Sequence, residues 1–348
     1  MTAISDTNTK TMDISDSANV YQKLQQWLVN HPIMFPLLLI IIVCLVVGTI
    51  APSFWQMANV FDILRASVIR GLFALGVLVV LAAGGLEVSF TSVAALVMYS
   101  VTMLVTNYMP ELGFFPIMVM GAIGGTLLGV VNGLLVNTLK APSLIVTIGT
   151  QYAFRGFLLT FIGTALFMNI PASMEQFGQI TLVTLTNDAG FEVKLPAYVL
   201  VLLAAALLTW FILNHTLMGR AIYATGGNPD IAERLGFKVP QVQLFVFAYA
   251  GFLAGIAGIL HVSSNRLANP FDLAGTELAV IAAVVLGGAR ITGGSGSVGG
   301  TMLGVILITL VSNVLILVGI PSTWQTAILG SFILIAGLFF CFTDKKQA

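Results

Sequence analysis

The chain has 348 residues and no net charge, and only 8% of its residues are charged whereas 58% are hydrophobic. Soluble domains carry about 25% charged residues, so this composition excludes an ordinary water-exposed surface. Because the net charge is zero, the composition does not indicate the basic surface that nucleic-acid-binding proteins present. The composition instead indicates a protein embedded in the lipid bilayer. The charge-free runs 112–139, 195–219 and 239–265 each reach the roughly 20 residues that one helical crossing needs.

The chain begins with a polar segment, residues 1–33, that is rich in Ser, Thr, Asn and Asp. It lacks the basic region directly before an apolar core that a cleavable signal peptide requires. We expect a disordered cytoplasmic tail that ends in a short interfacial helix around residues 21–28.

Apolar runs fill the rest of the chain and predict an all-α polytopic membrane protein with about ten transmembrane helices, some of them broken. They form one transmembrane domain, 34–343, followed by a cytoplasmic tail, 344–348. The run 114–139 is long enough to tilt, and 277–289 is short for a full crossing. The predicted spans are 34–50, 68–83, 91–108, 114–139, 144–167, 197–214, 242–261, 277–289, 298–318 and 323–342.

Lys and Arg residues predict the orientation, because they are enriched in cytoplasmic loops. With an even number of spans and the N-terminus inside, most of them lie on the inner side, so both termini are expected in the cytoplasm. Arg155 lies within a predicted span and is left uncounted. The inner set is Lys10, Lys23, Lys140, Arg220, Arg234, Lys238, Arg290, Lys345 and Lys346, and the outer set is Arg65, Arg70, Lys194 and Arg266.

Two connections between spans are unusually polar. Residues 168–196 are expected outside, and residues 215–241 inside. In the inner connection Asn228 is a good helix cap, Pro229 suits the first helical position, and Gly236 suits the stop, so a short helix is predicted. The pattern leaves open whether this helix docks a partner or merely connects two spans.

Three charged residues lie in or beside apolar spans: Glu87 and Arg290, each after a double glycine, and Arg155. Ionisable residues in membrane spans are functional candidates by default, and Gly-rich breaks are typical of the discontinuous helices that line transport sites. The alternative is that Glu87 and Arg290 sit at helix ends within reach of water. The candidates for a translocation path are Gly84, Gly85, Glu87, Ser89, Phe90, Asn132, Arg155, Gly287, Gly288 and Arg290.

Catalytic and metal-binding motifs are missing from the sequence. A phosphate-binding loop needs Gly-Lys-Ser/Thr, and no lysine follows a glycine, so the chain does not hydrolyse ATP by that route. Its three histidines are far apart, and Cys44 and Cys341 lie in apolar segments. We therefore expect no catalytic residue, no metal and no cofactor on this chain.

Four segments, 82–96, 141–157, 219–243 and 275–307, together resemble the permease subunits of bacterial carbohydrate ABC importers, in the branch that handles ribose, xylose, galactose and autoinducer-2. The resemblance extends over residues 52–342. It implies a ten-helix permease in the bacterial inner membrane that pairs with a second copy or a paralogue. It also implies a cytoplasmic ATPase that binds the ATP and a periplasmic binding protein that delivers a small sugar-like solute.

The same resemblance implies that the inner connection, 215–241, is the ATPase-coupling loop, in which 228–236 form the short helix that fills a groove on the ATPase. The residues carried over are Gly219, Arg220, Gly226, Gly227, Asn228, Pro229, Ala232 and Gly236.

One departure concerns the first break. Where such permeases usually read Gly-Gly-Ile-Asp-Leu-Ser-Val-Gly-Ser, this chain has a longer acid at Glu87, Phe90 in place of valine, and Thr91 in place of a glycine. Glu87 and Phe90 are expected to narrow or reshape that region if it lines the path, which leaves the identity of the solute open.

Two other classes compete with the importer reading. An ion-coupled secondary transporter would use Glu87, Arg155 and Arg290 as a buried charge relay. A non-transporting membrane scaffold or receptor would gain little from interrupted helices.

Overall fold

The computed structural model describes residues 33–186, 190 and 192–317, with scattered positions between 319 and 334. Residues 1–32 of the predicted tail 1–33, with the predicted helix at 21–28, therefore lie outside the described residues. So do most of the last predicted span, 323–342, and Cys341.

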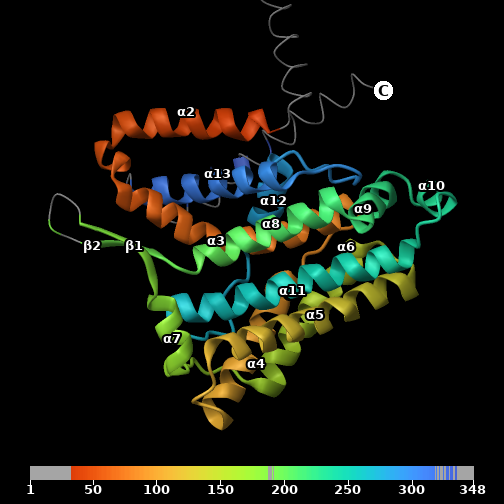
Figure 1. Cartoon of the computed structure of the whole chain (residues 1–348), viewed down its shortest axis with the longest axis horizontal. Helices are drawn as coiled ribbons and strands as arrows, with labels where there is room; N and C mark the ends of the chain where they lie inside the picture. Colours follow the sequence, from red (N-terminus) through yellow and green to blue (C-terminus); the bar gives the residue numbers. More distant parts are fainter. Residues whose placement is uncertain are drawn as a thin grey trace, which may run out of the picture.

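The described chain is a helical bundle whose long helices run roughly side by side (Figure 1). In its first half the elements are α2 (Met34–Ile50), the 3-10 turn η1 (Pro52–Trp55), α3 (Met57–Ala82), α4 (Phe90–Tyr108), α5 (Phe114–Leu139), α6 (Ser143–Phe157) and its π-helical continuation η2 (Leu158–Ile162). In its second half they are α7 (Ala172–Gln179), β1 (Thr181–Thr186), β2 (Glu192–Pro196), α8 (Val199–His215), α9 (Leu217–Gly227), α10 (Pro229–Arg234), α11 (Val239–Asn265), α12 (Glu277–Leu286) and α13 (Val298–Leu317).

Six of these helices are long and apolar enough to cross a membrane, or seven if α8 and α9, which meet at 74°, count as one bent span. The all-α polytopic class is therefore confirmed. The count is below the predicted ten because α2 and α12 are shorter apolar helices and most of the last predicted span is not described. The six are α3, α4, α5, α6 together with η2, α11 and α13.

Helix α3 is the centre of the bundle, since nearly every residue from 67 to 82 is buried. A helix that is apolar all round is expected in such a position. Its start is earlier than predicted, at Met57 instead of 68, because Asp62 and Arg65 interrupt the apolar run without ending the helix. Their side chains pair with each other at 2.8 Å on the exposed face.

Helices α5 and α11 pack closely against each other along their glycines. Added Cβ atoms at Gly125, Gly251 or Gly255 would overlap backbone atoms of the facing helix, and one at Gly121 would overlap the Ile259 side chain. Interfaces of this kind, in which small residues let two backbones meet, are a common packing solution between membrane helices.

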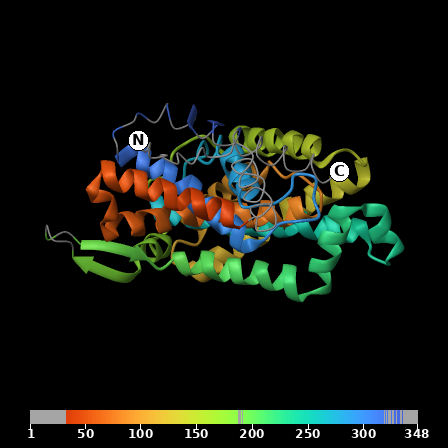
Figure 2. The same cartoon turned by 90° about the horizontal axis from the view of Figure 1, so that it is seen from above.

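The bundle has two distinct ends. Helix α7 and the antiparallel β1–β2 pair lie at one, which we call the hairpin end, and α9 and α10 lie at the other, which we call the loop end (Figure 1). The hairpin was not predicted, since the stretch 168–196 was recognised only as a polar connection. Seen from above, α2 lies along the outside of the bundle beside α13 (Figure 2).

Candidate translocation and coupling site

The first Gly-rich break separates α3 from α4, and it holds Glu87. Gly84 there has a φ of 82°, a left-handed conformation that glycine adopts without steric cost. The break is anchored on α6, because the Ser143 hydroxyl accepts a hydrogen bond from Leu86 N at 2.8 Å and the Thr147 hydroxyl donates one to Leu86 O at 3.3 Å. The loop between α3 and α4 is therefore fixed in place by hydrogen bonds to α6.

Glu87 is only 2% exposed, so its carboxylate does not lie at a wet helix end. Its Oε1 accepts hydrogen bonds from the backbone and the hydroxyl of Ser89 at 2.6 and 2.7 Å. Asn132 of α5, 1% exposed, donates to Glu87 Oε2 at 3.2 Å and to the Ser89 hydroxyl at 2.7 Å. A buried carboxylate needs such partners. The structure therefore brings three of the predicted path residues together.

A second buried carboxylate, Glu277 at the start of α12, was not predicted as a site residue. It is 7% exposed, and its Oε1 accepts hydrogen bonds from the Thr91 hydroxyl at 2.5 Å and from the Gln151 amide at 2.9 Å. Thr91 is the residue that departs from the expected glycine. The sequence does show an acid within the predicted span 277–289, but both hydrogen-bond partners of Glu277 lie far away in the chain.

The other predicted path residues lie elsewhere. Phe90 is buried and packs on Phe73, with ring centroids 4.9 Å apart. Arg155 is half-buried and lines a small pocket together with Thr91 and Asp272. Arg290 is exposed at the loop end. Glu87, Arg155 and Arg290 thus do not form one buried cluster.

The second Gly-rich break follows α12. Gly287 closes that helix and packs on Gly300 of α13, where a Cβ would lie 2.5 Å from the Gly300 carbonyl oxygen. Gly288, with a φ of 91°, starts the turn that leads to Arg290. Both predicted breaks are therefore present.

The inner connection has the predicted local structure. The Thr216 hydroxyl caps α9 through Gly219 N at 3.1 Å, and the Asn228 side chain caps α10 through Ile231 N at 3.1 Å. Pro229 takes the first position of α10, and Gly236 has a φ of 90° after its end. The sequence signals for a short helix are confirmed.

This connection touches both breaks at one place, which we call the glycine junction (Gly84, Gly226, Gly293 and Gly294). Gly294 N donates a hydrogen bond to Ala82 O at 3.0 Å, which joins the second break to the end of α3. A Cβ at Gly226 would overlap the carbonyl oxygen of Ala82, and one at Gly293 would lie 2.6 Å from Gly84 Cα. Three backbone segments therefore meet without side chains between them.

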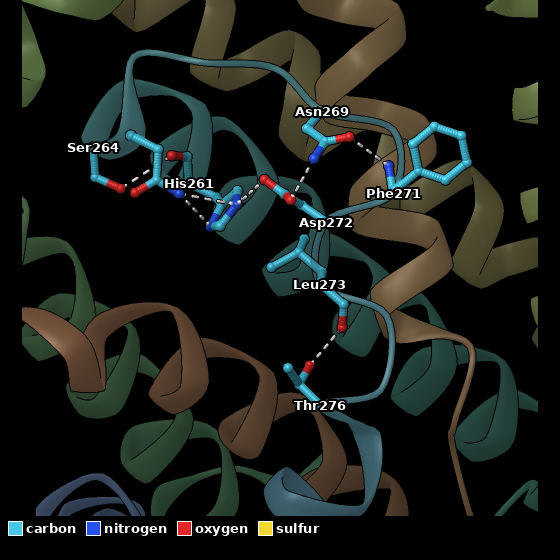
Figure 3. A network of polar contacts seen from close by, with 8 residues as sticks. His261, Ser264, Asn269, Phe271, Asp272, Leu273 and Thr276 are labelled. Atoms are coloured by element: carbon cyan, nitrogen blue, oxygen red, sulfur yellow. Dashed lines mark hydrogen bonds and ion pairs between the residues drawn. The ribbon is translucent and has the colours of Figure 1, made fainter. Parts of the chain in front are cut away.

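A large cavity of about 1010 Å³ opens at the hairpin end, between α3, α7, β2, α11 and the loop before α12. Figure 3 shows the polar contacts around His261, Asp272, Leu273 and Thr276, which are among the residues that line this cavity. His261 Nε2 lies 3.1 Å from Asp272 Oδ2, and Asn269 donates to Asp272 Oδ1 at 2.8 Å. The Thr276 hydroxyl donates to Leu273 O at 2.7 Å and so holds the loop directly before Glu277. Among the described residues no group of three or more His, Cys, Asp or Glu side chains is placed to hold a metal ion.

Comparison with known proteins identifies the family. Residues 59–337 match the family described as branched-chain amino acid transport system / permease component. The chain is 34% identical over 318 residues to the ribose import permease protein RbsC of Bacillus subtilis, covering 90% of this chain and 92% of that protein.

Two further relatives agree. The RbsC of Escherichia coli K12 is 29% identical over 92% of this chain and 95% of its own length. The autoinducer 2 import system permease protein LsrC of Yersinia pseudotuberculosis (strain YPIII) is 29% identical over 86% of this chain and 81% of its own length. No solved structure matches. The chain therefore belongs to the family of permease components of transport systems, and it is a membrane-spanning transport subunit rather than an enzyme.

Proposed function

We propose that this permease is a membrane-spanning subunit of an ATP-driven importer that carries a small sugar or sugar-like solute across the bacterial inner membrane. The family is described by branched-chain amino acid transport, but the relatives that share nearly the whole length are named for ribose and autoinducer 2. The solute class is therefore inferred from those relatives. The ion-coupled alternative loses its support, because Glu87, Arg155 and Arg290 do not form a relay.

The observation that carries the proposal is the exposed apolar surface at α10, at the loop end. Ile231 is 54% and Leu235 67% exposed, whereas Ala232 between them is fully buried and anchors the helix. An exposed apolar pair on a short, capped helix suits a groove on a partner protein. We assign that groove to a cytoplasmic ATPase, which would bind the ATP, and we assign Gly219 and Arg220 to positioning the loop.

The distribution of positive charge supports this orientation. Lys140 ends α5 at the loop end, where Arg220, Arg234 and Arg290 also lie, and cytoplasmic loops are enriched in Lys and Arg. The loop end and both termini are thus assigned to the cytoplasm. The hairpin end faces the periplasmic solute-binding protein, and a second permease copy or paralogue completes the membrane unit.

For the translocation path we propose the two buried carboxylates and their partners. Both hydrogen bonds that Glu277 makes within the described residues go to Oε1, which leaves Oε2 to accept from a solute hydroxyl. Carboxylates and amides such as Asn132 and Gln151 are the polar groups that recognise polyols in otherwise apolar sites. Gly84, Gly85, Gly287 and Gly288 shape the breaks, and Arg290 belongs to the cytoplasmic mouth.

The experiment is ATP hydrolysis by the full chain, co-expressed with its genetic-neighbour ATPase and reconstituted with the neighbouring binding protein. Pentoses, hexoses and autoinducer 2 are screened. Stimulation by one loaded binding protein supports the proposal and names the solute. A permease that associates with no ATPase would overturn it.

A matched pair of variants tests the contact itself. Ile231→Asp places a charge on the exposed face of α10 and is expected to abolish co-purification of the ATPase. The control is Leu185→Asp on β1, which is 40% exposed at the opposite end. Equal loss of the ATPase in both variants would show that the effect is not a contact at α10.

A further inference from the structure

The cavity at the hairpin end gathers positive charge. Its lining includes the guanidinium groups of Arg65, Arg70 and Arg266 and the ammonium group of Lys194, but only one carboxylate, Asp272. Asp272 is already engaged by His261 and Asn269. The four cations are the complete outer set of the orientation analysis, so the structure brings together residues that are scattered from α3 to the end of α11.

Three of the four cations have intramolecular counter-ions outside the lining. Arg65 pairs with Asp62 at 2.8 Å, Lys194 with Glu192 at 2.8 Å, and Arg266 with Glu175 at 3.8 Å. The hydrogen bond and the charge of Lys194 lower the pKa of Glu192. These pairs are exposed, and exposed pairs hold their partners only weakly. Their cations are free to turn toward a stronger anion.

Arg70 is different, because it lies deep. At 1.5 Å per residue it stands about 20 Å along α3 from Met57, next to the buried Phe73. Its one hydrogen bond within the described residues is a long one, 3.4 Å, from Nη1 to the Thr309 hydroxyl, and no carboxylate there pairs with it. A charge at such depth is costly unless it faces water or a counter-ion. The counter-ion is therefore missing from the described part of the chain.

We propose that the cavity is a binding site for a phosphate-bearing ligand, with Arg70 at its floor and Lys194, Arg65 and Arg266 at its mouth. Guanidinium groups match phosphate oxygens with two parallel hydrogen bonds, and this geometry makes arginine the preferred residue for such groups. The volume of about 1010 Å³ is at the upper end of that of small-molecule sites. A phosphate group supplies the charge that Arg70 lacks, whether it belongs to a soluble phosphate ester or to a lipid headgroup.

The test measures binding by the purified full chain in phosphatidylcholine nanodiscs, with glycerol 3-phosphate as the probe and glycerol as the neutral control. The phosphate ester is expected to bind and to raise the melting temperature, and glycerol is not. Arg70→Gln is expected to weaken binding about ten- to a hundredfold, the effect of losing a charged hydrogen-bond partner. Arg234→Gln in α10 is the matched control and should bind like the wild type.

A second variant keeps the proposal testable if the Arg70→Gln protein does not fold. Arg266→Gln changes an exposed side chain at the mouth and should weaken binding while leaving the ligand-free melting temperature unchanged. Nanodiscs with phosphatidylglycerol distinguish the sources: Arg70-dependent stabilisation by that lipid assigns the site to a headgroup, and its absence alongside glycerol 3-phosphate binding assigns it to a soluble ester.

The proposal is overturned if neither phosphate probe binds, or if both arginine variants bind as tightly as the wild type. Arg70-dependent docking of the solute-binding protein without binding of either phosphate probe also overturns it. Because the assay needs neither ATPase nor transport, its failure is separate from a failure of the proposed import function.

Discussion

The glycine junction makes a sharp prediction, because two adjacent glycines at the end of α9 differ in their surroundings. At Gly226 a Cβ would overlap the carbonyl oxygen of Ala82 and lie 2.5 Å from Gly294 N, whereas at Gly227 it would meet nothing within 4 Å. Relieving the first overlap to an ordinary contact requires the two backbones to separate by considerably more than about 1 Å, and packed interiors hold few voids that could accommodate such a shift. Overpacking of this kind costs about 1–3 kcal/mol.

We therefore expect Gly226→Ala to lower the melting temperature of the purified chain. We also expect the displacement of α9 to reduce the rate of solute-stimulated ATP hydrolysis about tenfold, which corresponds to a barrier higher by about 1.4 kcal/mol. Gly227→Ala is expected to keep both properties, since alanine is the better helix former and has room. Thermal unfolding and reconstituted ATPase assays on the two variants measure both effects. Equal behaviour of the two alanine variants would refute the argument that the junction connects α10 to the helix breaks.

Two further predictions concern the helix interface and the path. Gly125→Ala, whose Cβ would overlap the Gly251 carbonyl oxygen, should destabilise the chain by about 1–3 kcal/mol, whereas Gly149→Ala, with open space around it, should be neutral in the same unfolding assay. Glu277→Gln keeps the shape but removes the charge that accepts from Thr91 and Gln151, so it should lower solute-stimulated hydrolysis about tenfold or more while the basal rate stays unchanged. An unaltered response to solute would remove Glu277 from the path.

Local signals predicted local structure well. The bounds of α2 and α5 equal the predicted apolar runs 34–50 and 114–139. Helix α2 ends directly before the Ala51-Pro52 pair, where a helix is disfavoured, and the charged Lys140 follows α5. The cap, first turn and stop of α10 were also read correctly from Asn228, Pro229 and Gly236. These features depend on neighbours within a few residues, and such neighbours are visible in sequence.

Long-range contacts were not visible. Glu277 finds its partners 186 and 126 residues away in the chain, at Thr91 and Gln151, so no spacing rule could have paired them. The strand β1 does alternate Thr with apolar residues in part, but its pairing with β2 depends on a turn inside a segment that reads as polar connection. The outer cations Arg65 and Arg70 counted against the predicted orientation, and only the fold shows that they share one cavity with Lys194 and Arg266.

The glycines occur in two different structural settings. Between α5 and α11 they lie within two continuous helices and let the two backbones approach closely. At the junction Gly226 lies near the end of α9, and Gly84, Gly293 and Gly294 lie in the loops of the two breaks. Among the described residues the only hydrogen bond between the end of α3 and the second break there is from Gly294 N to Ala82 O. A contact made of backbone atoms cannot absorb a displacement by side-chain rotation, as an apolar contact does. We therefore expect a movement of α10 that pulls α9 to shift the end of α3 and the second break together. The first of these leads into the break that holds Glu87, and the second lies at the opposite end of α12 from Glu277.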